Sequence, residues 1–297
     1  MDRFHLMTVF VAVAETEGFA AGARRLNMSP PAVTRAIASL EAQLGVKLFN
    51  RTTRYVRTTE AGQRYLSDAR RILADLDAAD EAAAGINTEP RGHLTITAPA
   101  MFGRMHVMPG IIEYLERYPN TQVSAVFFDR VVNLLEEGID VGIRIGELPD
   151  SSMRALRVGE VRIITCAAPE YLAKNGIPKH PDELSEHEVI TSLAGNSSAN
   201  WSFPSTKSSQ RLTSRLKVTT NDAVIAAAEQ GLGIIRLLSY QVLPAVAEGK
   251  LQVILEDFEP TPQPVHIIHR EGRFSSARVR AFIDLLAEQL RANQSIH

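Results

Sequence analysis

Side chains that could bind phosphate are concentrated in one short stretch of this 297-residue chain. Residues 22–59 carry seven lysines and arginines and a single acid, Glu41, although the formal net charge of the whole chain is −2. The seven basic residues are Arg24, Arg25, Arg35, Lys47, Arg51, Arg54 and Arg57. A local excess of positive charge is typical of a surface that binds nucleic acid, and a solvated basic face would show the same composition.

The helix that must position part of this charge begins at residues 29–31, with the sequence Ser-Pro-Pro. Proline is tolerated in a first helical turn, because the N–H groups there have no intrahelical acceptor, and serine is a good N-cap. Apolar residues then recur at helical spacing, at Val33, Ile37, Leu40 and Leu44. The pattern predicts a helix that buries this stripe and turns Thr34 and Arg35 outward.

Two shorter helical patterns precede this helix and complete a helix-turn-helix. Residues 2–14 would bury Leu6, Phe10 and Val13, and residues 19–26 form a short helix that ends in a tight turn. In such a motif the second helix of the pair enters the major groove with its N-terminal residues nearest the bases. The residues predicted to contact DNA there are Ser29, Pro30, Pro31, Ala32, Thr34 and Arg35.

The segment after this helix predicts a basic hairpin, or wing. In the stretch KLFNRTTRYVRTTEAG, residues 47–62, Leu48 and Phe49 are expected to anchor the hairpin to the core. Arg51 and Arg54 are then predicted to reach phosphates or the minor groove. A basic loop on a helical hairpin is the alternative interpretation of the same residues.

A long heptad pattern follows the wing. Its apolar positions are Gly62, Tyr65, Ala69, Ile72, Leu76, Ala79, Ala83 and Ile86. An ordinary amphipathic helix packed on its own domain would show this spacing, but an alanine-rich seam between two domains favours close pairing with a second copy. The stretch GINTEPRG, residues 85–92, is expected to end the helix and act as a hinge.

From residue 93 onward the sequence alternates between strand and helix patterns, which predicts an α/β domain with mainly parallel sheets. Strands are expected at 94–97, 122–128, 141–145, 161–168, 233–237 and 265–269. Helices are expected at 103–118, 131–137, 221–230 and 275–290.

The stretch GFAAGARRLNMSPPAVTRAIASLEAQLGVKLFNRTTRYVRTTEAG resembles the winged helix-turn-helix of LysR-type transcriptional regulators, and the C-terminal pattern resembles the rest of that family. The resemblance implies a bacterial, effector-modulated DNA-binding regulator that pairs into dimers or tetramers and needs no cofactor or metal. Its partners would be double-stranded DNA, a small-molecule effector and the transcription machinery. The implied parts are an all-α winged helix-turn-helix domain at 1–60, a dimerising linker helix and hinge at 61–89, and an α/β effector-binding domain at 90–297. That domain would resemble a type 2 periplasmic binding protein, with subdomain I at 90–161 and 267–297 and subdomain II at 162–266.

Ligands of open α/β folds bind beyond the carboxyl ends of strands. Residues 97–103 lead into a helix start whose N–H groups favour an anion, and Arg144 could grip a carboxylate or instead pair with Asp140 or Glu147. The residues predicted to line the effector site are Pro99, Ala100, Met101, Phe102, Phe128, Arg144, Ser192, Asn196 and Asn221. The effector predicted from this set is a small organic acid.

Other chemistries find little support in the sequence. Cys166 is the single cysteine and lies in the apolar segment RIITCAA, so a buried thiol is expected. His266 and His269 would point to opposite faces of a strand and make a poor metal pair. We find no nucleophile–base pairing, signal peptide or membrane-spanning run, and therefore expect a cytoplasmic protein that is not an enzyme. The alternative function is a small-molecule-binding or enzymatic α/β protein whose N-terminal helices serve only for dimerisation.

Overall fold

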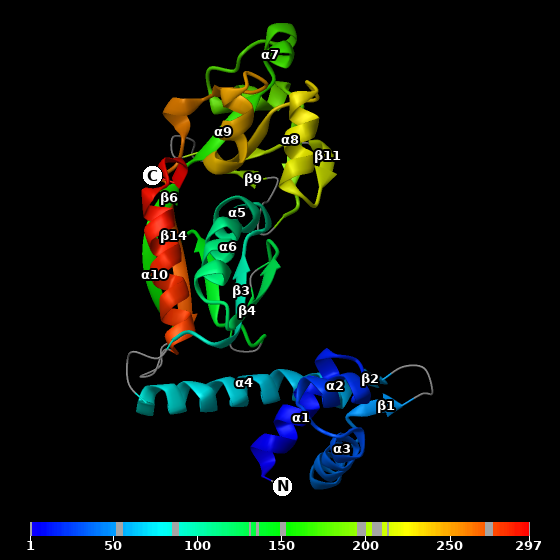
Figure 1. The fold of residues 1–297 in the computed structure, drawn as a ribbon. Coiled ribbons are helices and arrows are strands. Elements are labelled where there is room, and N and C mark those ends of the chain that lie inside the picture. The colour runs from blue at the N-terminus through cyan, green and yellow to red at the C-terminus, as the bar shows by residue number, and fades with distance from the viewer. Residues whose placement is uncertain are drawn as a thin grey trace. The chain divides into compact units, whose positions relative to one another are not determined.

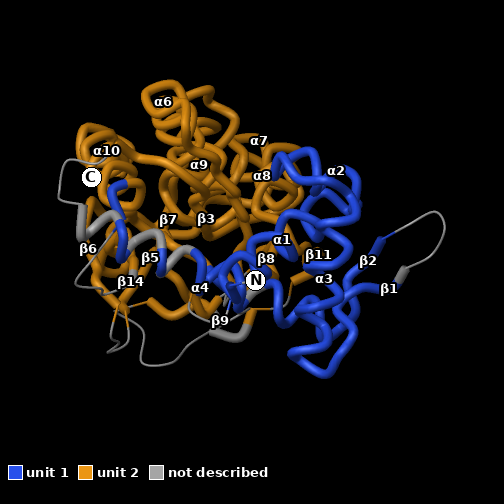
Figure 2. The backbone as a smooth tube through the Cα atoms, turned by 60° about the horizontal axis from the view of Figure 1, so that its bottom comes forward, with its two compact units in different colours: residues 1–88, 135–138, 273–277 blue, residues 89–134, 139–272, 278–297 orange. Residues whose placement is uncertain are grey.

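The computed structural model divides the chain into two units (Figures 1 and 2). Unit 1 comprises residues 1–88, 135–138 and 273–277, and unit 2 comprises residues 89–134, 139–272 and 278–297. The residues that the structure describes are 2–51, 56–84, 89–130, 132–134, 137–148, 153–194, 200–203, 210–212, 214–270 and 276–296.

Unit 1 is a winged helix-turn-helix followed by a long helix (Figure 1). Its elements are α1 (Arg3–Glu15), α2 (Phe19–Arg25), α3 (Pro30–Leu44), β1 (Phe49–Arg51), the antiparallel β2 (Val56–Thr58) and α4 (Glu60–Ala84). The apolar stripes predicted for α1 and α3 are confirmed, because Leu6, Phe10 and Ile37 are fully buried. The ring of Phe10 lies 5.2 Å from that of Phe49 and 5.4 Å from that of Tyr65, so the hairpin and α4 share the helical core.

The turn between α2 and α3 is as tight as predicted. Asn27 adopts a left-handed backbone conformation with a φ of 51°, which asparagine tolerates better than most residues, and its N–H donates to the carbonyl of Arg24 at 3.2 Å. Gly22 brings α2 onto α1, because a Cβ at this position would lie only 2.9 Å from the Cγ2 of Val13. These two residues set the angle at which α3 leaves the motif.

The first part of unit 2 is a five-stranded sheet in the order β4-β3-β5-β14-β6. Its strands are β3 (Gly92–Ala98), β4 (Thr121–Phe127), β5 (Val141–Ile145), β6 (Met153–Val161) and β14 (Gln263–Arg270). Its helices are α5 (Ala100–Phe102), the π-helical turn η1 (Gly103–Val107), α6 (Met108–Arg117), α10 (Ala277–Ala292) and the short 3-10 turn η4 (Gln294–Ile296). Tyr114 of α6 and Phe282 of α10 are fully buried with their rings 5.4 Å apart, so these two helices share the core of the sheet.

The second part of unit 2 contains three small sheets in the orders β12-β7-β13, β11-β8 and β10-β9. The strands are β7 (Ile163–Ala167), β8 (Val189–Ser192), β9 (Asn200–Trp201), β10 (Gln210–Arg211), β11 (Ser214–Val218), β12 (Ile235–Leu238) and β13 (Gln252–Ile254). The helices are α7 (Pro169–Asn175), α8 (Asn221–Glu229), α9 (Ser239–Ala247) and the 3-10 turns η2 (Pro181–Glu186) and η3 (Glu256–Phe258). Cys166 of β7 is fully buried, as predicted, and burial raises the pKa of its thiol to about 12.

The prediction of mainly parallel sheets is wrong. β3 is parallel to β4 and β5, and β11 is parallel to β8. In contrast, β14 is antiparallel to β5 and β6, and both β12 and β13 are antiparallel to β7. The physical reason is the path of the chain: it leaves the first sheet through β6, which was not predicted as a separate strand, and returns through β14.

The helix predicted at 131–137 is also wrong within the residues described there, because 132–134 and 137–138 are in loop and turn conformation. Val132 and Leu134 supply the apolar spacing that suggested a helix, but they are buried in a small cluster with Ile268. The described helices include none that is long and apolar enough to cross a bilayer.

Candidate nucleic-acid interface and effector site

The start of α3 leaves its polar and basic side chains exposed. Ser29 has extended backbone angles, and Pro30 and Pro31 occupy the first two helical positions, as predicted. The predicted side-chain cap is wrong, because Ser29 makes no capping bond with its hydroxyl. The prolines carry no N–H, and the next two N–H groups, of Ala32 and Val33, donate to the Ser29 carbonyl at 2.9 and 3.2 Å. The Ser29 hydroxyl is therefore not used in the helix start.

The outward face of α3 carries the side chains that were predicted to read bases. Thr34 and Arg35 are exposed, and the Thr34 hydroxyl donates back to the carbonyl of Pro30 at 3.0 Å. Ala32 is half-buried, and Ala36 is fully buried in the core of unit 1. The outward surface at the start of α3 thus carries small and basic side chains, which would suit close docking against a major groove.

Glu41, the single acid of the basic stretch, is withdrawn from this surface. Its side chain is buried and accepts hydrogen bonds from the ammonium of Lys47 at 2.9 Å and from the N–H groups of Leu48 at 2.9 Å and Phe49 at 3.3 Å. Burial alone would raise the pKa of Glu41, but these hydrogen bonds outweigh burial and lower its pKa. The exposed charges of the described residues in 22–59 are therefore all positive.

One of the basic side chains in residues 22–59, Arg25, faces another part of unit 1. Arg25 forms an ion pair with Glu15 at 2.6 Å, and Arg70 of α4 approaches the other oxygen of Glu15 to 3.0 Å. Arg24 and Arg57 are exposed. For Arg51 only the backbone is described, paired with Val56 across the hairpin, and Arg54 lies outside the described residues. Contacts of Arg51 and Arg54 with DNA stay predictions.

The first half of the predicted dimer seam is used inside unit 1. Ala69 is fully buried, and Tyr65 and Ile72 pack against the same core. A Cβ on Gly62 would overlap the carbonyl oxygen of Leu48. The prediction that the whole seam pairs with a second chain is therefore wrong for Gly62 and Ala69, and for the half-buried Tyr65 and Ile72 it stays a prediction. Beyond them, Leu76 is half-buried and Ala79 is exposed, whereas the Ala83 side chain and residues 85–88 lie outside the description.

In unit 2, the predicted anion-binding helix start already holds a carboxylate. Pro99 precedes α5, and the N–H of Ala100 donates to the Oδ1 of Asp129 at 3.0 Å. Met101 is half-buried, but Phe102 is fully buried, so its placement in the effector lining is corrected to a place in the core. An acidic effector at Ala100 would have to displace Asp129.

Arg144 is engaged with backbone carbonyl groups. Its guanidinium donates to the carbonyl of Ile143 at 2.9 Å and to that of Val132 at 3.5 Å. Phe128 is half-buried, and the guanidinium of Arg130 lies 4.4 Å from the centre of its ring. These contacts give Arg144 a role in holding the loop at Val132 beside β5.

Two predicted residues of the second part of unit 2 meet. The hydroxyl of Ser192 donates to the Oδ1 of Asn221 at 2.5 Å, at the start of α8, and accepts from the N–H of Ala194 at 3.0 Å. Asn196 lies outside the described residues. A hydrogen bond from Thr220 lowers the pKa of the neighbouring Asp222, and the positive charge of Arg104 acts in the same direction.

The comparisons with known proteins decide the family. The profile described as "Bacterial regulatory helix-turn-helix protein, lysR family" matches residues 4–63, and that described as "LysR substrate binding domain" matches residues 87–291. The chain belongs to the LysR family of transcriptional regulators. It is a DNA-binding regulator with a substrate-binding domain, not an enzyme.

Several relatives of this LysR-family chain match over almost their full length. The transcriptional regulator CrgA of Neisseria meningitidis serogroup B (strain ATCC BAA-335 / MC58) is 33% identical over 290 residues, which cover 97% of each chain. The transcriptional activator TtdR of Escherichia coli (strain K12) is 33% identical over 285 residues, 95% of this chain and 91% of TtdR. The solved structure of CrgA matches with a TM-score of 0.62 and 31% identity, covering 96% and 98% of the two chains. The Vibrio cholerae virulence activator AphB, at 24% identity and a TM-score of 0.61 over 97% and 99% of the chains, supports the fold.

Sequence reasoning about this LysR-family regulator missed an aromatic cluster that joins the two parts of unit 2. The ring of Tyr240, in α9, lies 5.2 Å from that of Phe102 and 5.4 Å from that of His106. Burial raises the pKa of Tyr240 and lowers that of His106, whose Nδ1 is 3.1 Å from the amide nitrogen of Asn293. No sequence spacing links these segments. They meet only because the chain passes from the first part of unit 2 to the second between β6 and β7 and returns to the first at β14.

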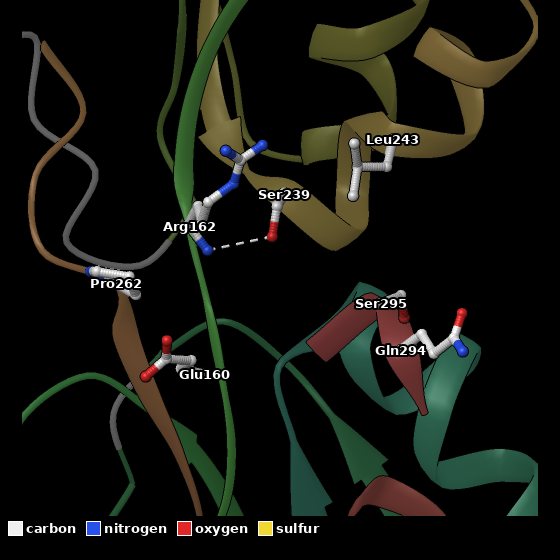
Figure 3. Close-up of a pocket in the computed structure, with 7 residues that line it drawn as sticks. All are labelled: Glu160, Arg162, Ser239, Leu243, Pro262, Gln294 and Ser295. Atoms are coloured by element: carbon white, nitrogen blue, oxygen red, sulfur yellow. Dashed lines mark hydrogen bonds between the residues drawn. The ribbon is translucent and has the colours of Figure 1, made fainter. Parts of the chain in front are cut away.

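A cavity of about 410 Å³ lies elsewhere on the same two parts of the LysR-family substrate-binding domain (Figure 3). Its lining consists of Glu160, Arg162, Ser239, Leu243, Pro262, Gln294 and Ser295. The Arg162 N–H donates to the Ser239 hydroxyl at 3.1 Å, and the Arg162 guanidinium lies 3.4 Å from Glu256 and 3.5 Å from Glu259. None of the predicted effector residues lines this cavity.

Proposed function

We propose that this regulator binds a partly palindromic DNA site as a homodimer and that a small-molecule effector in unit 2 modulates that binding. The observation that carries the DNA-binding half is the burial of Glu41, which leaves only positive charges exposed among the described residues of 22–59. Thr34 and Arg35 would read base edges, and the residues from Ser29 to Ala32 would allow close approach to the groove. Arg51 and Arg54 would contact the DNA backbone or minor groove.

The dimer would form through the part of α4 that unit 1 leaves uncovered, which begins near Leu76. Two-fold pairing there would present two α3 helices to two half-sites. Unit 2 offers a further apolar surface on α6 and β4, where the side chains of Ile112, Leu115 and Val126 are 52%, 37% and 43% exposed. Exposed large apolar side chains on an edge strand and on a neighbouring helix are typical of protein contacts, which supports a tetramer. The regulator would act in the cytoplasm, where it would meet DNA and the transcription machinery.

The effector would bind near Ala100, Ser192 and Asn221. A ligand changes the protein only if it binds two states with different affinity. The two parts of unit 2 provide such states, because they are joined by the crossing strands β6 and β14. For an organic acid, binding at Ala100 would exchange the Asp129 carboxylate for that of the ligand, and this exchange would couple occupancy to the end of β4.

The DNA-binding proposal is tested by selection from a library of random DNA duplexes with the full-length protein. Wild type should enrich an inverted pair of half-sites. Arg35→Ala should change the bases that are enriched, whereas Arg64→Ala, which replaces another exposed arginine, paired with Glu60 on α4, should not. Unchanged base preference in Arg35→Ala would remove that residue from base readout, and failure of wild type to enrich any sequence would refute the proposed site.

A further inference from the structure

The backbone of one residue in unit 1, Leu48, is held from both sides by the two helices that matter for DNA binding. The N–H of Leu48 donates to the Oε1 of Glu41, in α3, at 2.9 Å. The carbonyl of Leu48 accepts the N–H of Thr59, directly before α4, at 2.9 Å. The same carbonyl lies where a Cβ of Gly62, in α4, would have to be. The N–H and the carbonyl of a single residue thus join α3 to the linker helix.

The α3 side of this junction is built as a buried anchor. Glu41 is only 3% exposed and also accepts the N–H of Phe49 at 3.3 Å and the ammonium of Lys47 at 2.9 Å. A carboxylate that accepts three hydrogen bonds has little freedom to rotate, because any change of rotamer would leave buried donors unsatisfied. The beginning of the wing is therefore attached rigidly to α3.

The α4 side is equally closed. The hydroxyl of Thr59 donates to the carbonyl of Lys47 at 2.7 Å and accepts the N–H of Gly62 at 2.9 Å, which starts α4 against the same backbone. Only glycine permits this approach, since a Cβ on Gly62 would overlap the Leu48 oxygen. One to two turns further along α4, Ala69 is fully buried in the unit 1 core.

We propose that Glu41, the backbone of Leu48, Thr59 and Gly62 form a positioning clamp, the Leu48 clamp, that holds α3 at one angle to the linker helix. The consequence is that the regulator reads its two half-sites at one fixed spacing. This inference rests on the proposed dimer, because spacing exists only between two copies of α3.

The lever arm explains why such a clamp would matter. The 11 residue steps from Glu41 back to Pro30, at the start of α3, span about 17 Å at about 1.5 Å per residue. A rotation of about 10° at Glu41 would move the start of the helix by about 3 Å, which is close to the rise of about 3.4 Å per base pair. Looseness of this size at the junction would let the protein accept neighbouring spacings.

A merely structural role for the four residues predicts a different result. Lower stability would weaken binding to every site equally and leave the preferred spacing unchanged. A positioning role alters the distribution of spacings among the sites that the folded protein still binds. The two roles are therefore separated by comparing spacing with affinity.

The experiment uses full-length protein and a library of random DNA duplexes, with Gly62→Ala and Glu41→Gln as test variants. Gly18→Ala is the matched control for the first, because a Cβ there meets only ordinary contacts at 3.6 Å or more. Glu60→Gln is the matched control for the second, because the Glu60 side chain is 87% exposed. Hydrogen exchange of the Leu48 and Thr59 amides reports the clamp directly in each protein.

Wild type and both controls should enrich one dominant spacing between half-sites. In the test variants, the fraction of selected duplexes with that spacing should fall about threefold or more, while the bases preferred in each half-site stay the same. The Leu48 amide should exchange about tenfold faster in Glu41→Gln. If Gly62→Ala fails to fold, Glu41→Gln alone decides the outcome. An undiminished dominant spacing in a folded test variant overturns the clamp while leaving the dimer intact. Enrichment of single half-sites by wild type overturns the dimer, and the clamp's function with it.

Discussion

Replacing Glu41 with glutamine should lower the free energy of unfolding of unit 1 by about 2 kcal/mol at pH 7. The carboxylate is buried and accepts the N–H groups of Leu48 and Phe49. Hydrogen bonds to a charged acceptor contribute about 1.5–3 kcal/mol, and glutamine keeps an oxygen for the backbone donors but loses the charge. The Lys47 side chain is 76% exposed, so losing its ion pair adds little.

The same substitution should remove a pH dependence. Because the folded-state pKa of Glu41 is lowered, its stabilisation is fully present above its unfolded-state pKa of about 4.3 and is lost as the pH falls through the lower folded-state value. The difference in unfolding free energy between wild type and Glu41→Gln should therefore be largest near neutral pH. It should shrink as the pH falls below about 4.3.

Hydrogen exchange measured by mass spectrometry on peptides from residues 30–49 isolates unit 1, which a melting curve of the full chain would not do. The matched control is Glu60→Gln, an exposed carboxylate that should change the free energy of unfolding by less than about 0.5 kcal/mol. Equal and small effects of both substitutions at pH 7 would refute the reasoning. An unchanged difference between wild type and Glu41→Gln at pH 3 and pH 7 would refute the assigned pKa shift.

Three further substitutions test the other assignments. Arg54→Ala should weaken binding to all DNA sequences and reduce the salt slope by about one, as measured by titration at several salt concentrations; an unchanged slope would place this side chain away from phosphate. Ile72→Asp should destabilise unit 1 by about 2–4 kcal/mol, because Ile72 packs on the core of unit 1. Leu76→Asp should instead leave unit 1 folded and shift the sedimentation of the protein toward that of a monomer. A Leu76→Asp dimer that persists would exclude Leu76 from the interface. Asp129→Ala should free the Ala100 N–H and tighten binding of a carboxylate effector about tenfold by calorimetry, and weaker binding would show that Asp129 itself holds the ligand.

Much of unit 1 follows from local sequence. The helical stripe through Ile37, the helix start at Pro30 and the tight turn at Asn27 need only nearby residues, because helical periodicity, proline geometry and left-handed turns are local properties. The resemblance to LysR-type regulators also rests on one continuous stretch, and the family profiles confirm it. For unit 2, the alternation of strands and helices indicated an α/β fold with several strand positions, such as β5 and β14.

The tertiary structure decided which of several local possibilities each residue takes. The heptad pattern of α4 could serve its own domain or a second chain, and only the burial of Ala69 shows that the first half serves its own domain. Strand direction depends on where the chain crosses between sheets, which no local pattern contains. Likewise, the helix start at Ala100 looked open to an anion until Asp129 was brought to it from the end of β4. Each outcome depends on groups distant in sequence competing for the same donor or the same apolar surface, and only the folded chain sets that competition.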